Sequence, residues 1–417
     1  MSAHTFATVF ATLVLASLAW RLFLGARQLR HVAAHRDEVP ADFAGAIPLD
    51  AHRKAADYTV DKQRLAMAEA IVIDGVMLLV LTIGGGIAAI DAAAARAFGD
   101  GYVRDLATVF GTVLATTVAA LPFDLYRTFV IEERHGFNRM TAPLFVADFA
   151  KGLLLTAALG TPLLLGVFWL LDRAGPAWWF YTWIVWVLFT MALVVAFPRW
   201  IAPFFNRFSP LEDADLRARI ERLLARCGFT SSGLFVMDGS RRSSHGNAYF
   251  TGFGKTKRIV FFDTLIDRLT PPEIEAVLAH ELGHFARGHI PRLLGVRFLL
   301  ALVLLAALGW LWREPAFAEA LRLPGPRIGA LLAGFTLLVP VFTFPFQPLA
   351  SLMARRQEFE ADAFAAQHAS AGDLVSALAK LYRDNASTLT PDPLHSLVYD
   401  SHPPAALRID HLRKAAP

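Results

Sequence analysis

Long apolar stretches dominate the pattern of hydrophobic and polar positions along this chain. Seven of them are long enough to cross a bilayer, which takes about 20 residues of α-helix. They cover roughly residues 5–25, 67–90, 103–125, 149–171, 177–198, 293–312 and 328–350. The pattern therefore predicts a mainly α-helical protein that crosses a membrane several times.

Residues 206–292 interrupt this series with the mixed pattern of a small α/β module. Residues 211–228 have a helical period and end at a glycine. Residues 233–238 resemble a short strand, and residues 247–266 resemble two strands around a turn that contains glycine and lysine. A further helix is expected to begin at Thr270, because the sequence Thr-Pro-Pro-Glu combines an N-cap, a proline at the first helical position and a capping box.

These patterns divide the chain into four parts. We expect an N-terminal membrane region with five spans (1–205), a soluble module (206–292), two further spans (293–350) and a C-terminal helical region (351–417).

Composition supports placement in a membrane. Hydrophobic residues make up 55% of the chain and charged residues 18%, against about 25% charged in soluble domains. No basic tract interleaved with aromatic residues is present, so the sequence gives no indication of nucleic-acid binding. Cys227 is the single cysteine, which excludes an intrachain disulfide and suggests a buried structural thiol.

The distribution of positive charge predicts the orientation of the chain. The first apolar stretch has no Lys or Arg before it and several after it, which favours a retained anchor over a cleaved signal peptide. Lys and Arg are abundant in the first loop and sparse in the second, and this alternation places loops one, three and five inside. Residues 199–292 and 351–417 then share the cytoplasmic face. Together with an Ala- and Arg-rich composition, this suggests a multi-pass protein of a bacterial inner membrane.

The strongest chemical signal is the sequence His280-Glu281-Leu282-Gly283-His284. Residues four apart lie on one face of a helix, so the two imidazoles can bind one zinc ion. Glu281 is placed to act as the general base, because it can take a proton from a zinc-activated water and pass it to the leaving amine.

Catalytic zinc usually has three protein ligands, and the candidates for the third are His289, Glu358 and Glu360. On a continuous helix His289 would point away from His284, so we interpret it as structural. Residues 356–362 are expected to begin a helix, on which Glu358 and Asp362 share a face and Glu360 points elsewhere. We therefore predict Glu358 as the ligand and Asp362 as the acceptor of a histidine ring N–H. The competing interpretation is an exposed acidic helix face.

Asp74 lies inside the second apolar stretch. A carboxylate within a membrane is a candidate for function, and it can equally be a structural hydrogen-bond partner of a neighbouring helix. We assign it no role at this point.

Several segments together resemble one known family, the type I CAAX prenyl endopeptidases, which are integral-membrane zinc metalloproteases. The similarity covers nearly all of residues 25–415 and keeps the family's order of motifs. The segments are FVIEERHGFNRMT at 129–141, IAPFFNRFSPL at 201–211, SSHGNAYFTGFGKTKRIVFFDTL at 243–265, HELGHFARGH, EFEADAFA, and Ser401-His402-Pro403-Pro404 followed by Arg408.

The resemblance implies roles for individual residues. His280, His284 and Glu358 match the zinc ligands, Glu281 the base and Asp362 the residue behind a ligand. Three further positions match an edge strand that pairs with an extended substrate, namely Asn247, Ala248 and Tyr249. Two more match residues that line the site, His402 and Arg408, of which His402 is expected to donate a hydrogen bond to the oxyanion.

The resemblance also implies a fold and an activity. The fold would be a ring of about seven transmembrane helices around a chamber, closed by a small α/β zinc metallopeptidase domain. Family members remove the last three residues of a prenylated C-terminal Cys-a-a-X peptide, so the expected partners are one Zn²⁺ ion, a peptide or protein substrate that can be prenylated, and the lipid bilayer.

Three other functions compete with this one. A membrane quality-control protease of broad specificity would use the same chemistry on other substrates. A non-catalytic scaffold would have no need of a base beside two metal ligands, so the intact Glu281 argues against it. A transporter would account for Asp74 but not for the zinc motifs.

Overall fold

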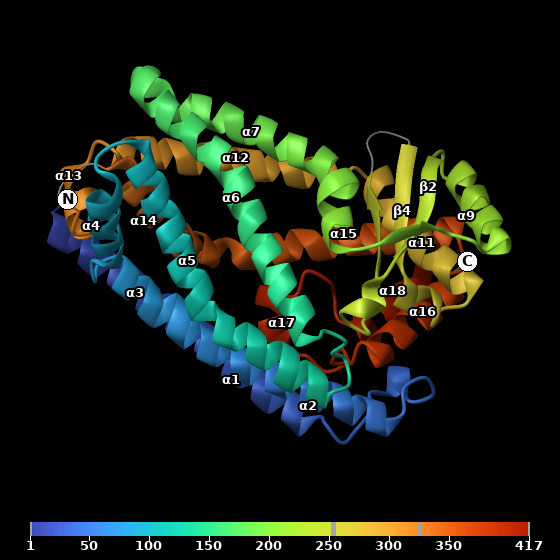
Figure 1. The fold of residues 1–417 in the computed structure, drawn as a ribbon. Coiled ribbons are helices and arrows are strands. Elements are labelled where there is room, and N and C mark those ends of the chain that lie inside the picture. The colour runs from blue at the N-terminus through green and yellow to red at the C-terminus, as the bar shows by residue number, and fades with distance from the viewer. Residues whose placement is uncertain (1, 252–255, 324, 326, 416–417) are drawn as a thin grey trace.

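The computed structural model describes residues 2–251, 256–323, 325 and 327–415. Figure 1 shows the long helices arranged as a ring, with the strands and the C-terminal helices gathered at one end. The helices of the N-terminal half are α1 (Ala3–Ala34), α2 (Leu49–Glu69), α3 (Leu78–Leu81), α4 (Gly86–Phe98), α5 (Tyr102–Tyr126), α6 (Ala142–Arg173), α7 (Trp178–Ala196) and α8 (Ala202–Phe205). This arrangement agrees with the predicted ring of helices closed by an α/β part.

Among the described residues, six helices are long and apolar enough to cross a membrane. A seventh span arises if the bent pair Leu49–Leu81 and Gly86–Phe98 is counted as one. The predicted number of spans is therefore confirmed with this pair included, and the protein is a multi-pass membrane protein.

The predicted span 67–90 is not one straight helix. It contains a π-helical segment, η2 (Ala70–Met77), and a 57° bend after Leu81. Glycines allow the bend, because Gly85 has a φ of +85° and a Cβ on Gly84 would lie 2.6 Å from the carbonyl oxygen of Val80. Apolar composition predicts that a segment enters the membrane, but it does not predict that the segment stays straight.

An ion pair joins two of these membrane helices. Arg21 of α1 donates to Asp74 of η2 at 2.8 Å, and the Arg21 guanidinium stacks over the ring of Phe344. Asp74 thus has an oppositely charged partner, as carboxylates in membranes usually have.

Residues 206–292 contain a four-stranded sheet of order β1-β2-β4-β3. Strand β2 (Thr230–Met237) pairs antiparallel with β1 (Phe208–Pro210) and parallel with β4 (Thr256–Phe262), and β3 (Ala248–Thr251) pairs antiparallel with β4. The predicted strands are present, although β2 begins three residues before the predicted 233. The predicted glycine- and lysine-containing turn, at 252–255, lies outside the described residues.

Helices pack around this sheet and form the principal core. They are α9 (Ala214–Arg226), α10 (Asp263–Ile266), α11 (Pro271–Ala286), α15 (Gln347–His368), α16 (Ala371–Asp384) and α18 (Ala405–Ala415). The other helices of the C-terminal half are α12 (His289–Leu311), α13 (Pro315–Ala320), α14 (Ile328–Thr343) and α17 (Pro393–Tyr399). Ile220 of α9, Phe261 of β4 and Leu282 of α11 are fully buried in this core. Each such side chain contributes about 1.5–3 kcal/mol by burial, so the helix that carries the histidine motif is firmly anchored. Cys227 packs at the edge of the same core, and burial raises the pKa of its thiol.

Helix α11 begins as predicted, with a capping box between Thr270 and Glu273. The Glu273 carboxylate also accepts hydrogen bonds from Ser376 (2.6 Å) and Lys380 (2.8 Å) of α16. Burial alone would raise the pKa of Glu273, but these donors outweigh it and lower the pKa to about 2. One side chain therefore both starts the helix and fixes it to its neighbour.

The helix that carries Glu358 does not begin near residue 356 as predicted. A 3₁₀ turn, η7 (Phe344–Phe346), follows α14, and α15 then starts at Gln347 inside the predicted span 328–350. Prolines explain the break, because Pro345 and Pro348 lack the N–H that a continuous helix needs. The consequence is that α15 extends without interruption from the apolar segment to the candidate site.

Candidate metal centre

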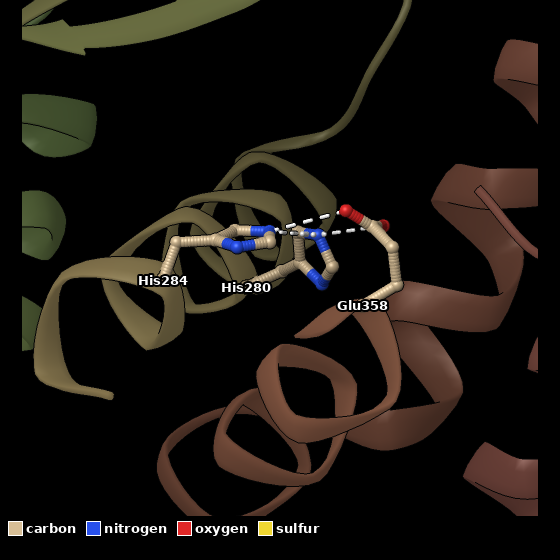
Figure 2. Close-up of side chains that lie close together, drawn as sticks. All are labelled: His280, His284 and Glu358. Atoms are coloured by element: carbon tan, nitrogen blue, oxygen red, sulfur yellow. Dashed lines mark hydrogen bonds and ion pairs between the residues drawn. The ribbon is translucent and has the colours of Figure 1, made fainter. Parts of the chain in front are cut away.

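Helices α11 and α15 bring together the three predicted metal ligands. His280, His284 and Glu358 each offer one ligand atom, and these atoms lie within 4.8 Å of one another. The two imidazole Nε2 atoms are 3.3 Å apart, and the Glu358 oxygens lie 3.5 Å from His280 Nε2 and 3.3 Å from His284 Nε2. Figure 2 shows the three side chains converging from the two helices.

The chemistry of this group fits a cation. Two imidazoles and one carboxylate form a His₂Glu set, which is an established arrangement for catalytic zinc. Glu358 is 5% exposed, and its Oε2 atom is buried without a hydrogen-bond partner among the described residues. A buried carboxylate is costly unless positive charge faces it. The Arg408 guanidinium, 3.4 Å from Oε2, supplies part of this charge, and a divalent ion between the three side chains would add to it.

Asp362 lies directly behind His280. Its Oδ1 atom is 2.8 Å from His280 Nδ1, and the side chain is fully buried. Burial alone would lower the pKa of His280, but without a metal its hydrogen bonds to Asp362 and Glu358 outweigh this and raise the pKa to about 9. A bound metal would displace the proton on Nε2. The Asp362 hydrogen bond also leaves His280 Nε2 facing the other two ligands.

Arg408 contacts the predicted site residues Glu358 and Asp362 from the buried side of the site. The residue is 5% exposed and donates to both Asp362 oxygens, at 2.9 and 2.6 Å. A third guanidinium nitrogen is 3.4 Å from Glu358 Oε2. Arg408 thus fixes the positions of the Asp362 and Glu358 carboxylates, and little of its side chain is exposed.

His402 occupies the open side of the site. Its side chain is 61% exposed, and its Nε2 atom is 3.5 Å from Glu358 Oε1. Ser401 lies 3.0 Å from the other ring nitrogen. Next to it is a cavity of about 310 Å³ that Tyr382 and Asp400 also line. Glu281 follows His280 on α11 and is partly exposed.

The predicted substrate strand lies at an edge of the sheet. Ala248 and Tyr249 belong to β3, which pairs only with β4 among the described strands. Asn247 precedes the strand, and its carbonyl oxygen accepts a hydrogen bond from Phe262 at 2.9 Å. The other edge of β3 therefore has no strand partner in the described part of the chain, which is the condition for adding an extended peptide.

The contacts of His289 and Glu360 with the histidine motif were not predicted from their spacing. The helix is not continuous, because it ends at Ala286 and Gly288 adopts a φ of +67°. The chain changes direction there, and His289 Nδ1 lies 2.9 Å from His284 Nδ1 while His289 Nε2 lies 3.1 Å from Glu360 Oε2. The expectation that His289 points away from the histidine motif is therefore wrong. Gly288 could have indicated that the helix ends before His289, since glycine commonly follows a helix C-terminus.

Comparison with known proteins agrees with this geometry. Residues 28–207 match the family model described as "CAAX prenyl protease N-terminal, five membrane helices", and residues 210–416 match "Peptidase family M48". The "CAAX prenyl protease 1 homolog" of Arabidopsis thaliana is 39% identical over 314 residues, covering 74% of this chain and 73% of the relative. The mouse protein of the same name is 30% identical and covers 95% and 93%.

The similarity extends to a solved structure. The "Crystal Structure of S. mikatae Ste24p" superposes with a TM-score of 0.89 at 29% identity, covering 97% of this chain and 98% of the other. Fold and site together thus define a polytopic membrane metallopeptidase. More specifically, the chain belongs to peptidase family M48, in the branch with a CAAX prenyl protease N-terminal region, and it is an enzyme with protease activity.

Proposed function

We propose that this protein is a zinc-dependent endopeptidase that processes CAAX-type C-terminal peptides at the membrane. The observation that carries the proposal is the convergence of the two imidazole Nε2 atoms and the Glu358 carboxylate within 4.8 Å of one another. His280, His284 and Glu358 would hold the zinc ion, and a zinc ion bound there would polarise the scissile carbonyl and lower the pKa of bound water to about 7.

The surrounding side chains have distinct tasks in this proposal. Glu281 takes the proton of the attacking water and returns it to the leaving amine. His402 is open to the site and donates a hydrogen bond to the oxyanion. Arg408 and Asp362 keep Glu358 and His280 in position. The free edge of β3, from Asn247 to Tyr249, binds the extended peptide backbone.

The names of the relatives and the position of the site support the proposed substrate class. The relatives are named CAAX prenyl proteases, and helix α15 connects an apolar segment directly with the metal ligand Glu358. A site at the end of membrane helices suits a peptide that carries an apolar isoprenoid. We place the protein in a bacterial inner membrane with the site facing the cytoplasm, as the distribution of Lys and Arg predicts.

Hydrolysis of a farnesylated CAAX peptide by the purified protein tests the proposal. Wild type should cleave the peptide, and Glu281→Gln should retain stoichiometric zinc but lose activity by at least about 10²-fold, the lower end of the effect of general acid–base catalysis. Glu212→Gln, an exposed control, should behave as wild type. Cleavage by a zinc-loaded Glu281→Gln protein at the wild-type rate would refute the assignment of the base.

Two further measurements separate the alternatives. Equal cleavage of farnesylated and unmodified peptides would favour a quality-control protease of broad specificity. A tag at the C-terminus should be digested by added protease in inverted membrane vesicles and protected in right-side-out vesicles; the opposite result would overturn the cytoplasmic orientation.

A further inference from the structure

A buried chain of polar side chains leads away from His284, on the side opposite to the other ligands. His284 Nδ1 contacts His289 Nδ1 at 2.9 Å, and His289 Nε2 contacts Glu360 Oε2 at 3.1 Å. The His289 side chain is 3% exposed, and Glu360 is partly exposed beside Arg356. None of these contacts has a role in the catalytic mechanism proposed above.

From this chain we infer that His289 and Glu360 are positioning residues for the metal ligand His284. The inference rests on the proposed zinc site and assigns it a second support, separate from Asp362. It also assigns His289 a function in the site beyond the structural one expected from its spacing.

The hydrogen-bond chemistry allows one arrangement of protons when a metal is bound. His284 Nε2 faces Glu358 and His280, so this nitrogen must offer its lone pair to the metal. A neutral imidazole then carries its proton on Nδ1 and donates it to His289 Nδ1. His289 in turn carries its proton on Nε2 and donates it to the Glu360 carboxylate. The carboxylate at the end of the chain thereby selects the tautomer of both rings.

The two histidine ligands are supported in parallel ways. His280 donates directly to the Asp362 carboxylate, whereas His284 reaches the Glu360 carboxylate through one intervening imidazole. Glu358, Glu360 and Asp362 stand two residues apart on α15. A single helix therefore supplies one ligand and the supports of the other two, so its position sets the geometry of the whole site.

A break in the helix makes this arrangement possible. Gly288 is left-handed and no atom lies within 4 Å of a Cβ built on it, so its backbone conformation rather than close packing favours glycine. The left-handed Gly288 separates α11 from α12, and the first residue of α12, His289, contacts His284 of α11.

Loss of such supporting hydrogen bonds typically lowers metal affinity 10- to 100-fold. The test measures the rate at which zinc leaves the purified full-length protein into an excess of chelator, together with the visible spectrum of the Co²⁺-substituted protein. His289→Phe removes the acceptor and should release zinc about 10-fold faster or more, with a changed Co²⁺ spectrum. His289→Gln can both accept and donate, and it should restore most of the wild-type behaviour.

Variants of Glu360 keep the test meaningful if His289→Phe does not fold. Glu360→Leu removes the terminal acceptor from a partly exposed position and should speed zinc release several-fold, whereas Glu360→Gln should have the smaller effect. His52→Phe serves as the control, because His52 is equally buried but bonds only to the backbone oxygen of His35 among the described residues.

The outcomes separate this inference from the proposed function. If wild type holds zinc and both His289→Phe and Glu360→Leu release it at the wild-type rate with an unchanged Co²⁺ spectrum, the supporting chain has no role. If wild type binds no zinc at all, the proposed function and this inference both fail. If zinc release accelerates as expected but no peptide is cleaved, the inference stands and the substrate assignment fails.

Discussion

Gly283 of α11 lies directly against Ala361 of α15. A Cβ atom built on Gly283 would be 2.9 Å from the Ala361 Cα atom and 3.1 Å from its carbonyl oxygen. The two helices that carry the proposed metal ligands can therefore approach one another this closely only because residue 283 has no side chain. Gly283 stands next to His284, so this contact sets the distance between the histidine motif and Glu358.

Gly283→Ala should disrupt the metal centre without changing any ligand. The added methyl group meets backbone atoms, which cannot rotate away, and overpacking of this kind typically costs about 1–3 kcal/mol. We expect a lower thermal unfolding temperature and zinc affinity reduced at least about 10-fold, as loss of a supporting contact typically produces. The matched control is Gly295→Ala in α12, where no atom lies within 4 Å of the new Cβ. Equal zinc affinity in the two variants would show that the close approach is unimportant.

Asp362→Asn should weaken metal binding through His280. The substitution removes the charge that accepts the His280 Nδ1 proton and leaves the buried Arg408 without its bidentate partner. Competition with a chelator should show about 10- to 100-fold weaker zinc binding, accompanied by reduced thermal stability. Asp410→Asn provides the comparison, because this aspartate is exposed and, within the described part of the chain, pairs only with Lys414. Wild-type zinc affinity in Asp362→Asn would contradict the positioning role.

The free energy of unfolding should decrease at low pH, as Glu273 becomes protonated. Its pKa in the folded protein is about 2, below its ordinary value of 4.5, so its contribution is fully present above pH 4.5 and is lost as the pH falls toward 2. A shift of this size in a side chain that is 5% exposed corresponds to about 3 kcal/mol.

Thermal unfolding in detergent from pH 7 to pH 3 measures the Glu273 effect. Glu273→Gln should unfold at a lower temperature than wild type at pH 7, and the difference should shrink as the pH approaches 3. A difference that stayed constant over this range would mean that the carboxylate charge contributes nothing.

The Arg21–Asp74 pair should matter for stability rather than for chemistry. Asp74→Ala leaves the Arg21 guanidinium without its 2.8 Å partner between α1 and η2. Thermal unfolding should therefore occur at a lower temperature, with zinc content and kcat unchanged. In a double-mutant cycle, Arg21→Ala with Asp74→Ala should destabilise less than the sum of the two single changes. Loss of kcat at wild-type stability would instead favour a functional role for Asp74.

Much of the fold could be predicted from local patterns. Apolar stretches located the membrane helices, and the Thr270–Glu273 capping box located the start of α11. The bend after Leu81 and the 3₁₀ turn at Phe344 were not predicted. Both interrupt stretches that remain apolar, so hydropathy alone carries no signal for them; glycine and proline positions carry it.

The sequence by itself determined the residues that could bind a metal. His280 and His284 share a helix face because of their spacing, and the family motifs identified Glu358, which lies 74 residues beyond His284. The spacing of residues predicts which side chains share one face of a helix, but it does not predict which groups of other segments lie opposite that face.

Only the tertiary structure decided what surrounds these ligands. It placed Arg408 against the Asp362 and Glu358 carboxylates, and it linked His289 and Glu360 to His284. The physical reason is that these contacts depend on the break at Gly288 and on the close approach of Gly283 to Ala361. The orientation of a side chain after a helix break, and the separation of two packed helices, result from contacts between distant segments and are not set by the period of either helix.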